Sequence, residues 1–174
     1  MDPTSFVFID ETGVTTNMVR RYGWGPKGDR LVDAAPYGHW RATTFVAGLR
    51  STGLTAPLVL EGPMTGTAFR AYVEQFLAPT LLLGDIVVMD NLAAHKVAGV
   101  QEAIAAVGAS ILYLPPYSPD LNPIEQTFAR LKALLRKASA RTRETLGTII
   151  GQLLHTFSPA ECRNYLANSA YAFD

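Results

Sequence analysis

The chain has 174 residues, enough for one domain with a full hydrophobic core and too few for two of ordinary size. Its 15 basic residues balance its 15 acidic ones, unlike the strongly basic composition of a stand-alone nucleic-acid binder, and no apolar run reaches the roughly 18 to 20 residues of a membrane span. The single cysteine, Cys162, allows no internal disulfide and the N-terminus shows no secretory pattern, so we expect a cytoplasmic location.

The first half of the chain predicts three strands and a helix. Residues 5–10 alternate in the manner of a buried strand, which places Asp10 and Glu11 on opposite sides and Asp10 at the strand's end. Residues 12–36 are rich in Gly, Arg and Pro, and we expect a long loop there, which is usually functional. Two strands of a meander follow, and then a helix that Thr65 or Thr67 caps. These three elements are expected at residues 40–49, 58–61 and 65–77.

The second half predicts a strand, a helix and a strand at residues 86–89, 97–107 and 110–114, and this unit requires the two strands to be parallel. Three more helices are expected at residues 122–138, 142–157 and 158–168. The predicted class is therefore α/β, with a mixed five-stranded sheet flanked by helices. This order of elements resembles that of the ribonuclease H-like fold, which implies that the first and fourth strands lie side by side and parallel, with their carboxyl ends meeting at one edge.

Three acidic residues stand where these elements begin or end. Asp10 closes the first strand, Asp90 follows the fourth, and Glu125 lies in the first turn of the helix at 122–138, with 34 residues (positions 91 to 124) between Asp90 and Glu125. Carboxylates are the ligands that Mg²⁺ prefers, and two such ions about 3.5 to 4 Å apart align a nucleophile with the leaving oxygen of a phosphodiester. The sequence therefore predicts a metal site that acts on phosphodiesters.

Each acid also has a structural alternative. Asp10 fits a strand-end residue at the surface, Asp90 fits an Asp-Asn turn, and Glu125 fits a capping box in which Asn122 is the cap and Pro123 the first helical residue. Taken singly, these alternatives are the better ones, and only the three acids together favour the metal site.

Two segments around the acids are the most specific in the chain. One is Asp-Asn-Leu-Ala-Ala-His-Lys at 90–96, and the other is Pro-Pro-Tyr-Ser-Pro-Asp-Leu-Asn-Pro at 115–123, whose prolines fix an extended lead into the Glu125 helix. With the spacing of the acids, they make residues from about 6 to 138 resemble the catalytic domain of mariner-superfamily transposases, on the bacterial insertion-sequence branch.

The resemblance implies a ribonuclease H-like fold and an acidic (DDE) triad of Asp10, Asp90 and Glu125. In the family pattern Asp10 bridges two Mg²⁺ ions, which Mn²⁺ can replace, while Asp90 binds one ion and Glu125 the other. The implied activity is DNA transposition, in which water nicks DNA at transposon ends and the freed 3′-OH attacks target DNA at TA dinucleotides. The implied setting is a bacterial cell, on chromosomal or plasmid DNA.

The implied partners are transposon terminal inverted repeats, target DNA and a second copy of the chain, as a homodimer assembled on DNA. We expect the 174 residues to form one catalytic domain, with a core at about 5–138 and C-terminal helices at 142–168, and the helix-turn-helix region that reads the repeats to be absent. A companion reading frame, a truncated copy or an isolated catalytic domain would each explain that absence. The alternatives are another ribonuclease H-like nuclease and an inactive remnant that binds only DNA or a partner.

Candidate DNA contacts come from three segments. The loop offers Arg21, Trp24 and Lys27, and the segment after Asp90 offers Asn91, His95 and Lys96, of which Asn91 and His95 either orient Asp90 or approach DNA. The third segment is a basic run at 130–143 that contains no acid, and its candidates are Arg130, Arg136 and Lys137. Packed or solvated side chains are the alternative for all of them. Glu11 is expected to face away from the site.

Overall fold

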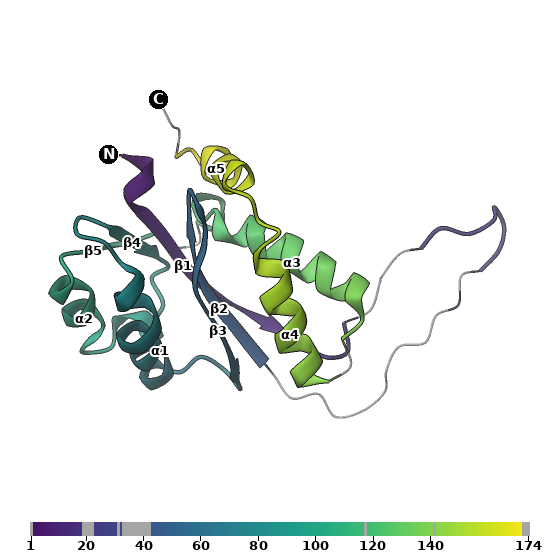
Figure 1. Ribbon diagram of the computed structural model, residues 1–174, viewed down its shortest axis with the longest axis horizontal. Coiled ribbons are helices and arrows are strands. Elements are labelled where there is room, and N and C mark those ends of the chain that lie inside the picture. The colour runs from purple at the N-terminus through teal and green to yellow at the C-terminus, as the bar shows by residue number, and fades with distance from the viewer. Residues whose placement is uncertain are drawn as a thin grey trace.

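The computed structural model describes residues 2–18, 23–30, 32, 43–116, 118–140 and 142–171. In this part of the chain, a five-stranded mixed sheet in the order β3-β2-β1-β4-β5 carries helices on both of its faces (Figure 1). The strands are β1 (Phe6–Val14), β2 (Thr43–Arg50), β3 (Gly53–Glu61), β4 (Ile86–Met89) and β5 (Ser110–Tyr113), and the α-helices are α1 (Gly66–Tyr72), α2 (Val100–Ala106), α3 (Ile124–Ala138), α4 (Arg143–Leu154) and α5 (Pro159–Asn168).

Alternation along β1 divides the core into two layers. Phe6 and Phe8 lie in the cluster with α3, α4 and α5, whereas Val7 and Ile9 lie in the cluster with α1 and α2. Continuing the same alternation puts Asp10 on the α3 side of the sheet and Glu11 on the α1 side, as the sequence predicts. The α3-side cluster also contains Phe45, Phe128, Leu131, Leu146, Ile150 and Leu166, and the α1-side cluster contains Val46, Phe69, Tyr72, Val87, Met89 and Ile104.

The predicted pairing of β1 with β4 is confirmed, but the predicted end of β1 at Asp10 is wrong. The parallel pairing with β4 covers only Phe6 to Phe8, while the antiparallel pairing with β2 continues from Phe8 to Val14. The hydrogen bonds of β2 therefore keep the chain extended for four residues beyond Asp10. Asp10 therefore lies inside β1, two residues past the end of the pairing with β4. On the α3 side of the sheet its side chain faces a cavity that the chain after β4 also lines.

The predicted parallel pairing of the last two strands is also confirmed, with Ile86 to Met89 opposite Ser110 to Tyr113. The helix between them is shorter than predicted, because Gly99 adopts a left-handed backbone (φ 94°) and its N–H is accepted by the Glu102 side chain. The α-helix therefore begins at Val100. A separate 3₁₀ turn, Ala93–Lys96, precedes it.

The ends of the other helices follow local signals. Thr65 caps α1, as predicted, and Thr142 and Ser158 cap α4 and α5, each hydroxyl accepting from the backbone N–H three residues later. The predicted helix at 65–77 is helical throughout but changes type. The α-helix α1 ends at Tyr72, and residues Val73–Leu77 form a π-helical turn. The predicted strand at 40–49 is described only from Thr43, because its first residues lie outside the described part of the chain.

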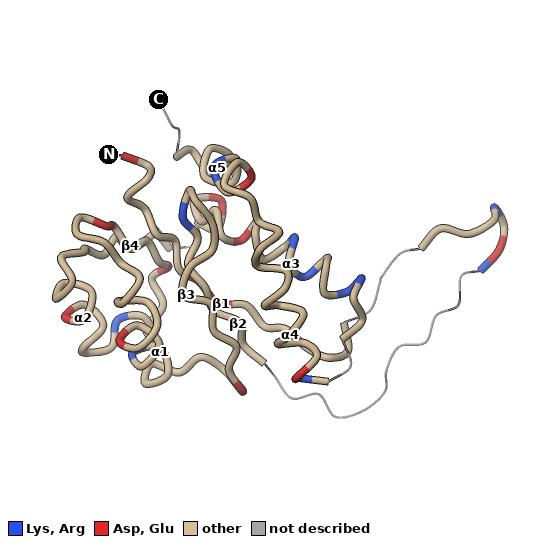
Figure 2. The backbone as a smooth tube through the Cα atoms, in the orientation of Figure 1, with Lys and Arg blue, Asp and Glu red and all other residues tan. Residues whose placement is uncertain are grey.

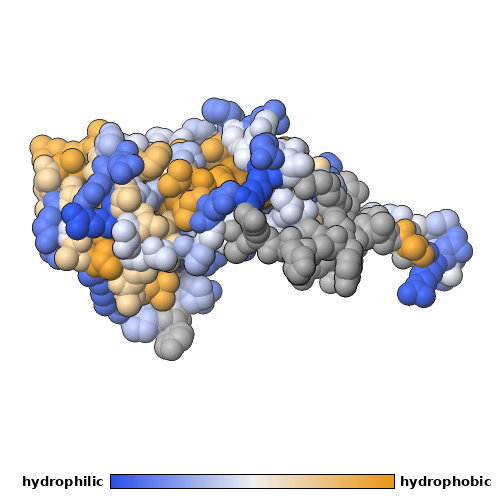
Figure 3. All heavy atoms as spheres, turned by 90° about the horizontal axis from the view of Figure 1, so that it is seen from below, coloured by the Kyte–Doolittle hydropathy of each residue, from blue (hydrophilic) through white to orange (hydrophobic). Residues whose placement is uncertain are grey.

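Among the described residues, no helix combines the length and the apolar character needed to cross a bilayer. On the face seen in Figure 3, hydrophobic surface is broken up by hydrophilic residues, so no single apolar patch covers it.

Candidate active site

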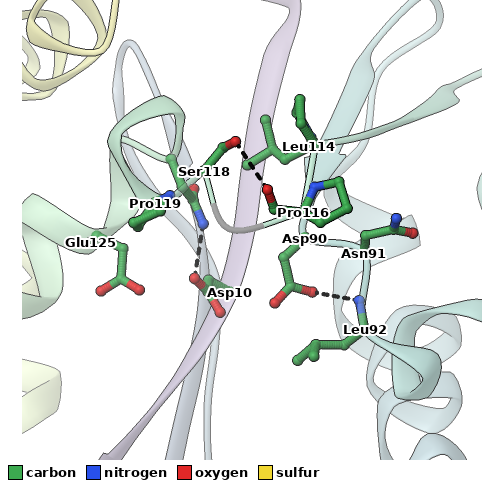
Figure 4. Close-up of a pocket in the computed structure, with 11 residues that line it drawn as sticks. Asp10, Asp90, Asn91, Leu92, Leu114, Pro116, Ser118, Pro119 and Glu125 are labelled. Carbon is green, nitrogen blue, oxygen red and sulfur yellow. Dashed lines mark hydrogen bonds between the residues drawn. The ribbon is translucent and has the colours of Figure 1, made fainter.

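A cavity of about 400 Å³ opens where β1 and β4 part. Its lining comes from β1, from the chain after β4, from the proline-rich segment after β5 and from the first turn of α3 (Figure 4). Three acids, Asp10, Asp90 and Glu125, line it, and none of the described lining residues is Lys or Arg. The structure thus brings the three predicted acids to one cavity, and the part of its wall that the structure describes contains no Lys or Arg.

Asp10 is the buried member of the three, with 9% of its surface exposed. Its Oδ1 accepts from the backbone N–H of Glu11 at 2.8 Å, and its Oδ2 accepts from the Asn122 side chain, also at 2.8 Å. Burial, together with the negative charges of Glu11, Glu125 and Asp90, raises the pKa of Asp10 to about 7, against the hydrogen bond from the Glu11 backbone, which lowers it. In the metal-free protein the ionised form of Asp10 is therefore less favourable than in the unfolded chain, and Asp10 becomes ionised only above about pH 7.

Asp90 follows β4 and is partly exposed. Its Oδ1 accepts from the backbone N–H of Leu92 at 3.1 Å and lies 2.6 Å from Nδ1 of His95. This contact is an ion contact and not a hydrogen bond: the distance is short, but Nδ1 has no hydrogen-bond partner among the described residues, so the two groups are poorly aligned. The other ring nitrogen, Nε2, lies 3.1 Å from the Glu11 carboxylate.

His95 is completely buried, so its predicted approach to DNA is wrong, and its position between the two carboxylates supports the alternative that it orients Asp90. Burial lowers the pKa of His95, but the hydrogen bond and charge of Glu11, with the charge of Asp90, outweigh burial and raise the pKa above its usual value.

Glu125 is exposed in the first turn of α3, and the capping box that was its structural alternative does not form. No side chain caps α3, whose first turn follows Pro123 in a helical conformation, and Asn122 instead points its amide at Asp10. A contact between residues 112 positions apart therefore replaces the local cap. Glu125 has no structural bond to the helix start, which leaves its carboxylate available to the cavity.

The donor set fits a hard divalent cation. Three carboxylates face a cavity whose described lining contains no Lys or Arg, and the buried Oδ1 of Asn122 beside them has no hydrogen-bond partner in the described ranges. No three Asp, Glu, His or Cys side chains in the described ranges lie close enough to hold one ion together. Asp90 and Glu125 instead lie on either side of Asp10 (Figure 4). This arrangement suits two ions, one between Asp10 and Asp90 and the other between Asp10 and Glu125.

The remaining candidates for DNA contact are scattered. Asn91 is exposed in the cavity wall, whereas Lys96 lies over the ring of Tyr113, 5.3 Å from its centre. Trp24 and Lys27 are exposed, with the Trp24 side chain fully accessible, and Arg21 lies outside the described residues.

The basic run at 130–143 is not uniform. Arg130 is partly exposed but engaged, because its guanidinium pairs with Glu161 and lies over the ring of Phe157, 4.7 Å from its centre. Arg136 and Lys137 have no such partner among the described residues, and Lys137 is exposed at the end of α3. Of the three candidates in this run, Arg136 and Lys137 stay predicted phosphate contacts, and Arg130 is engaged in packing α5 against α3.

Two contacts in the site had no signal in the sequence. An Asn directly before Pro and a helix is a usual cap, so nothing marked Asn122 as a partner of Asp10. Glu11 does face away from the cavity, as predicted, but it reaches the site indirectly through His95, which is 84 positions away.

A family model described as DDE superfamily endonuclease matches residues 5–147. No curated protein matches the chain significantly. Among solved structures, the chain is similar to the Mos1 transposase paired-end complex with left transposon end, at a TM-score of 0.68 and 15% identity over 99% of this chain and 57% of that chain. It is also similar to the Mos1 strand transfer complex, at 0.69 and 16% identity over 99% and 56%, and to the catalytic domain of Mos1 mariner transposase, at 0.64 and 14% identity over 98% and 85%.

At such low identity these similarities concern the fold, and they confirm the ribonuclease H-like arrangement expected for residues 5–138. The chain spans 57% of the length of the transposase in the paired-end complex and 85% of the separate catalytic domain.

Proposed function

Because the family model matches residues 5–147, the chain belongs to the DDE superfamily endonucleases, and we propose that it is the catalytic domain of a DNA transposase. The proposed reactions are cleavage of DNA at transposon ends by water and joining of the freed 3′-OH to target DNA. One observation carries the proposal: Asp10, Asp90 and Glu125 surround a cavity without a basic residue among its described walls. Such a cavity leaves its negative charge to be balanced by cations.

In this proposal Asp10, Asp90 and Glu125 would hold two Mg²⁺ ions, with Asp10 shared, Asp90 a ligand of one ion and Glu125 a ligand of the other. Solved Mos1 complexes contain Mg or Mn, which supports a divalent cofactor for this fold. The bound ions would activate the attacking hydroxyl and offset charge on the phosphate. The protein's part is to fix the carboxylates, and Asn122 and the Glu11 backbone do so for Asp10 by holding one lone pair on each of its oxygens.

Metal binding should be visible in stability and should depend on pH. We expect Mg²⁺ or Mn²⁺ to raise the melting temperature, because the ions bind only the folded carboxylates, and to raise it more at pH 8 than at pH 6. The sign follows from Asp10, whose pKa of about 7 means that a proton competes with the ion below that pH. Differential scanning fluorimetry with and without EDTA at both pH values measures this, and identical curves would show that the acids are not a preformed metal site.

DNA is the proposed partner, and the surface we propose for it includes the end of α3. Lys and Arg recur along α3 in Figure 2, and solved Mos1 complexes contain transposon-end DNA. We expect the affinity for a random duplex to fall steeply as the salt concentration rises. The double variant Arg136→Glu/Lys137→Glu should make the slope of log K against log[salt] shallower, by an amount that corresponds to the loss of up to about two phosphate contacts. Fluorescence anisotropy across a salt series measures the slope, and Arg130→Gln is the comparison, because Arg130 is paired with Glu161. An unchanged slope in the double variant would move the DNA path elsewhere.

Further parts of the proposal rest on the family resemblance alone. They are insertion at TA, a homodimer on DNA, and recognition of the terminal inverted repeats by a helix-turn-helix region outside these residues.

The decisive experiment separates the proposed transposase from its alternatives. The chain is incubated with Mn²⁺ and supercoiled plasmid, and separately with plasmid and a labelled oligonucleotide that has a free 3′-OH. Nicking together with transfer of the label supports a transposase. Nicking without transfer supports another ribonuclease H-like nuclease, and neither activity supports an inactive remnant.

A further inference from the structure

A buried chain of contacts connects the far side of the sheet to the candidate metal site. Glu11 leaves β1 on the α1 side, Nε2 of His95 lies 3.1 Å from its carboxylate, and Nδ1 of His95 lies 2.6 Å from Oδ1 of Asp90. Resting on the function proposed above, we propose that Glu11 and His95 are positioning residues, which fix the orientation in which Asp90 presents its carboxylate to the metal. Strand β1 would thus supply one ligand directly through Asp10 and orient another through Glu11.

The His95 ring is buried, and the backbone that carries it is anchored by hydrogen bonds. It has no exposed surface, its ring centre lies 4.2 Å from that of Phe69, and its backbone N–H donates to the carbonyl of Leu92 at 3.1 Å. The hydroxyl of Tyr113 reaches the His95 carbonyl at 3.5 Å. A ring fixed in this way cannot follow Asp90, so Asp90 must follow the ring.

The contacts fall on one oxygen of Asp90. Oδ1 accepts from the Leu92 N–H and makes the ion contact with Nδ1 of His95, while Oδ2 has no hydrogen-bond partner among the described residues. One oxygen is thereby committed to the protein and the other is left for the cavity. A freely rotating carboxylate would lose conformational entropy when it bound an ion, whereas one held in advance loses less.

A purely structural role for His95 is less consistent with the same observations. A core position that only fills space needs no polar groups, and burying a histidine between two carboxylates is unfavourable unless each contact contributes. Glu11 strengthens the point, because its side chain is only 18% exposed and its carboxylate meets the ring that contacts Asp90.

The test begins with Glu11, because its side chain does not line the cavity. Glu11→Ala removes the acceptor that fixes Nε2, and Mn²⁺ binding is expected to weaken by roughly 10- to 100-fold, the usual range for loss of a group behind a metal ligand. Glu11→Gln keeps an acceptor oxygen at the same place and is expected to restore most of the affinity. Electron paramagnetic resonance of free Mn²⁺, titrated with the full chain, measures binding without requiring cleavage.

A matched control separates positioning from stability. Asp85 precedes β4 as Asp90 follows it, and it pairs with Arg50 at 2.5 Å at the opposite end of that strand. Asp85→Asn is therefore expected to lower the melting temperature and to leave Mn²⁺ affinity unchanged.

A second pair of variants tests the two contacts of the His95 ring, with Asp90 and with Glu11, separately. The amide nitrogen of Asn lies near the position of Nδ1 and that of Gln near Nε2, so His95→Asn keeps a donor toward Asp90 and His95→Gln keeps one toward Glu11. The Asn variant is expected to bind Mn²⁺ more tightly than the Gln variant.

Three results would overturn the inference: parental Mn²⁺ affinity in Glu11→Ala, no recovery in Glu11→Gln, or tighter binding by His95→Gln than by His95→Asn. If the parent chain itself binds no Mn²⁺, the proposed function fails and the inference fails with it. If the parent binds and only the Glu11 and His95 variants behave unexpectedly, the proposed function stands and the inference alone is wrong.

Discussion

Glu125→Gln is expected to abolish Mn²⁺-dependent nicking of supercoiled plasmid while leaving the melting temperature of the metal-free chain nearly unchanged. The loss of activity should exceed the roughly 10- to 100-fold typical of residues behind a metal ligand, because a neutral amide oxygen cannot replace a charged ligand of a hard cation. The fold should tolerate the change, since Glu125 is exposed and no side chain caps α3.

Nicked and supercoiled plasmid are separated on agarose after a time course, and thermal unfolding is followed by circular dichroism. Asp120→Asn provides the matched control, because it removes one exposed acid close to Glu125 that does not line the cavity. The control should nick at the parental rate. A Glu125→Gln variant that also did so would remove Glu125 from the site and leave a pair of acids on β1 and after β4.

The sheet and its helices could be predicted because they depend on local patterns. Alternation of apolar residues placed Asp10 and Glu11 on opposite sides of β1, and the strand-helix-strand unit required β4 and β5 to be parallel. The extension of β1 beyond Asp10 could not be predicted, because it depends on pairing with Thr43 to Val46, about 30 residues later along the chain.

The acids of the site were predictable, but what holds them was not. Asn122 and Glu125 stand at the spacing of a capping box, and the local sequence gives no reason to prefer the amide's bond to Asp10. The basic run could not be resolved from local sequence either, because Arg130 forms its ion pair with Glu161 on α5, and only the packing of α5 against α3 brings the two side chains together. Local sequence predicts which residues are available, and tertiary contacts decide which of them are already engaged.

Asp10→Asn is expected to stabilise the metal-free chain at pH 8 while it abolishes cleavage. The folded pKa of Asp10 is about 7 and its unperturbed value is 3.8, so between these values the unfolded chain ionises and the folded one stays protonated. Folded protein then binds more protons, and stability falls as pH rises through that window, by up to about 4 kcal/mol above pH 7. Asparagine does not titrate, so the variant escapes this loss.

Urea unfolding of both chains in EDTA, at pH 5 and pH 8, measures the effect. The variant's advantage should be smaller at pH 5, about 1.6 kcal/mol, because only the part of the window from 3.8 to 5 has been crossed there, and should grow to about 4 kcal/mol at pH 8. Added Mg²⁺ should then reverse the order, because only the parent gains a bound ion from its carboxylate. If the variant were more stable than the parent by the same amount at both pH values, the folded protein would not raise the pKa of Asp10. The reversal by Mg²⁺ would identify the instability of the metal-free site as the consequence of gathering ligands for a cation, a stability cost that active sites commonly carry.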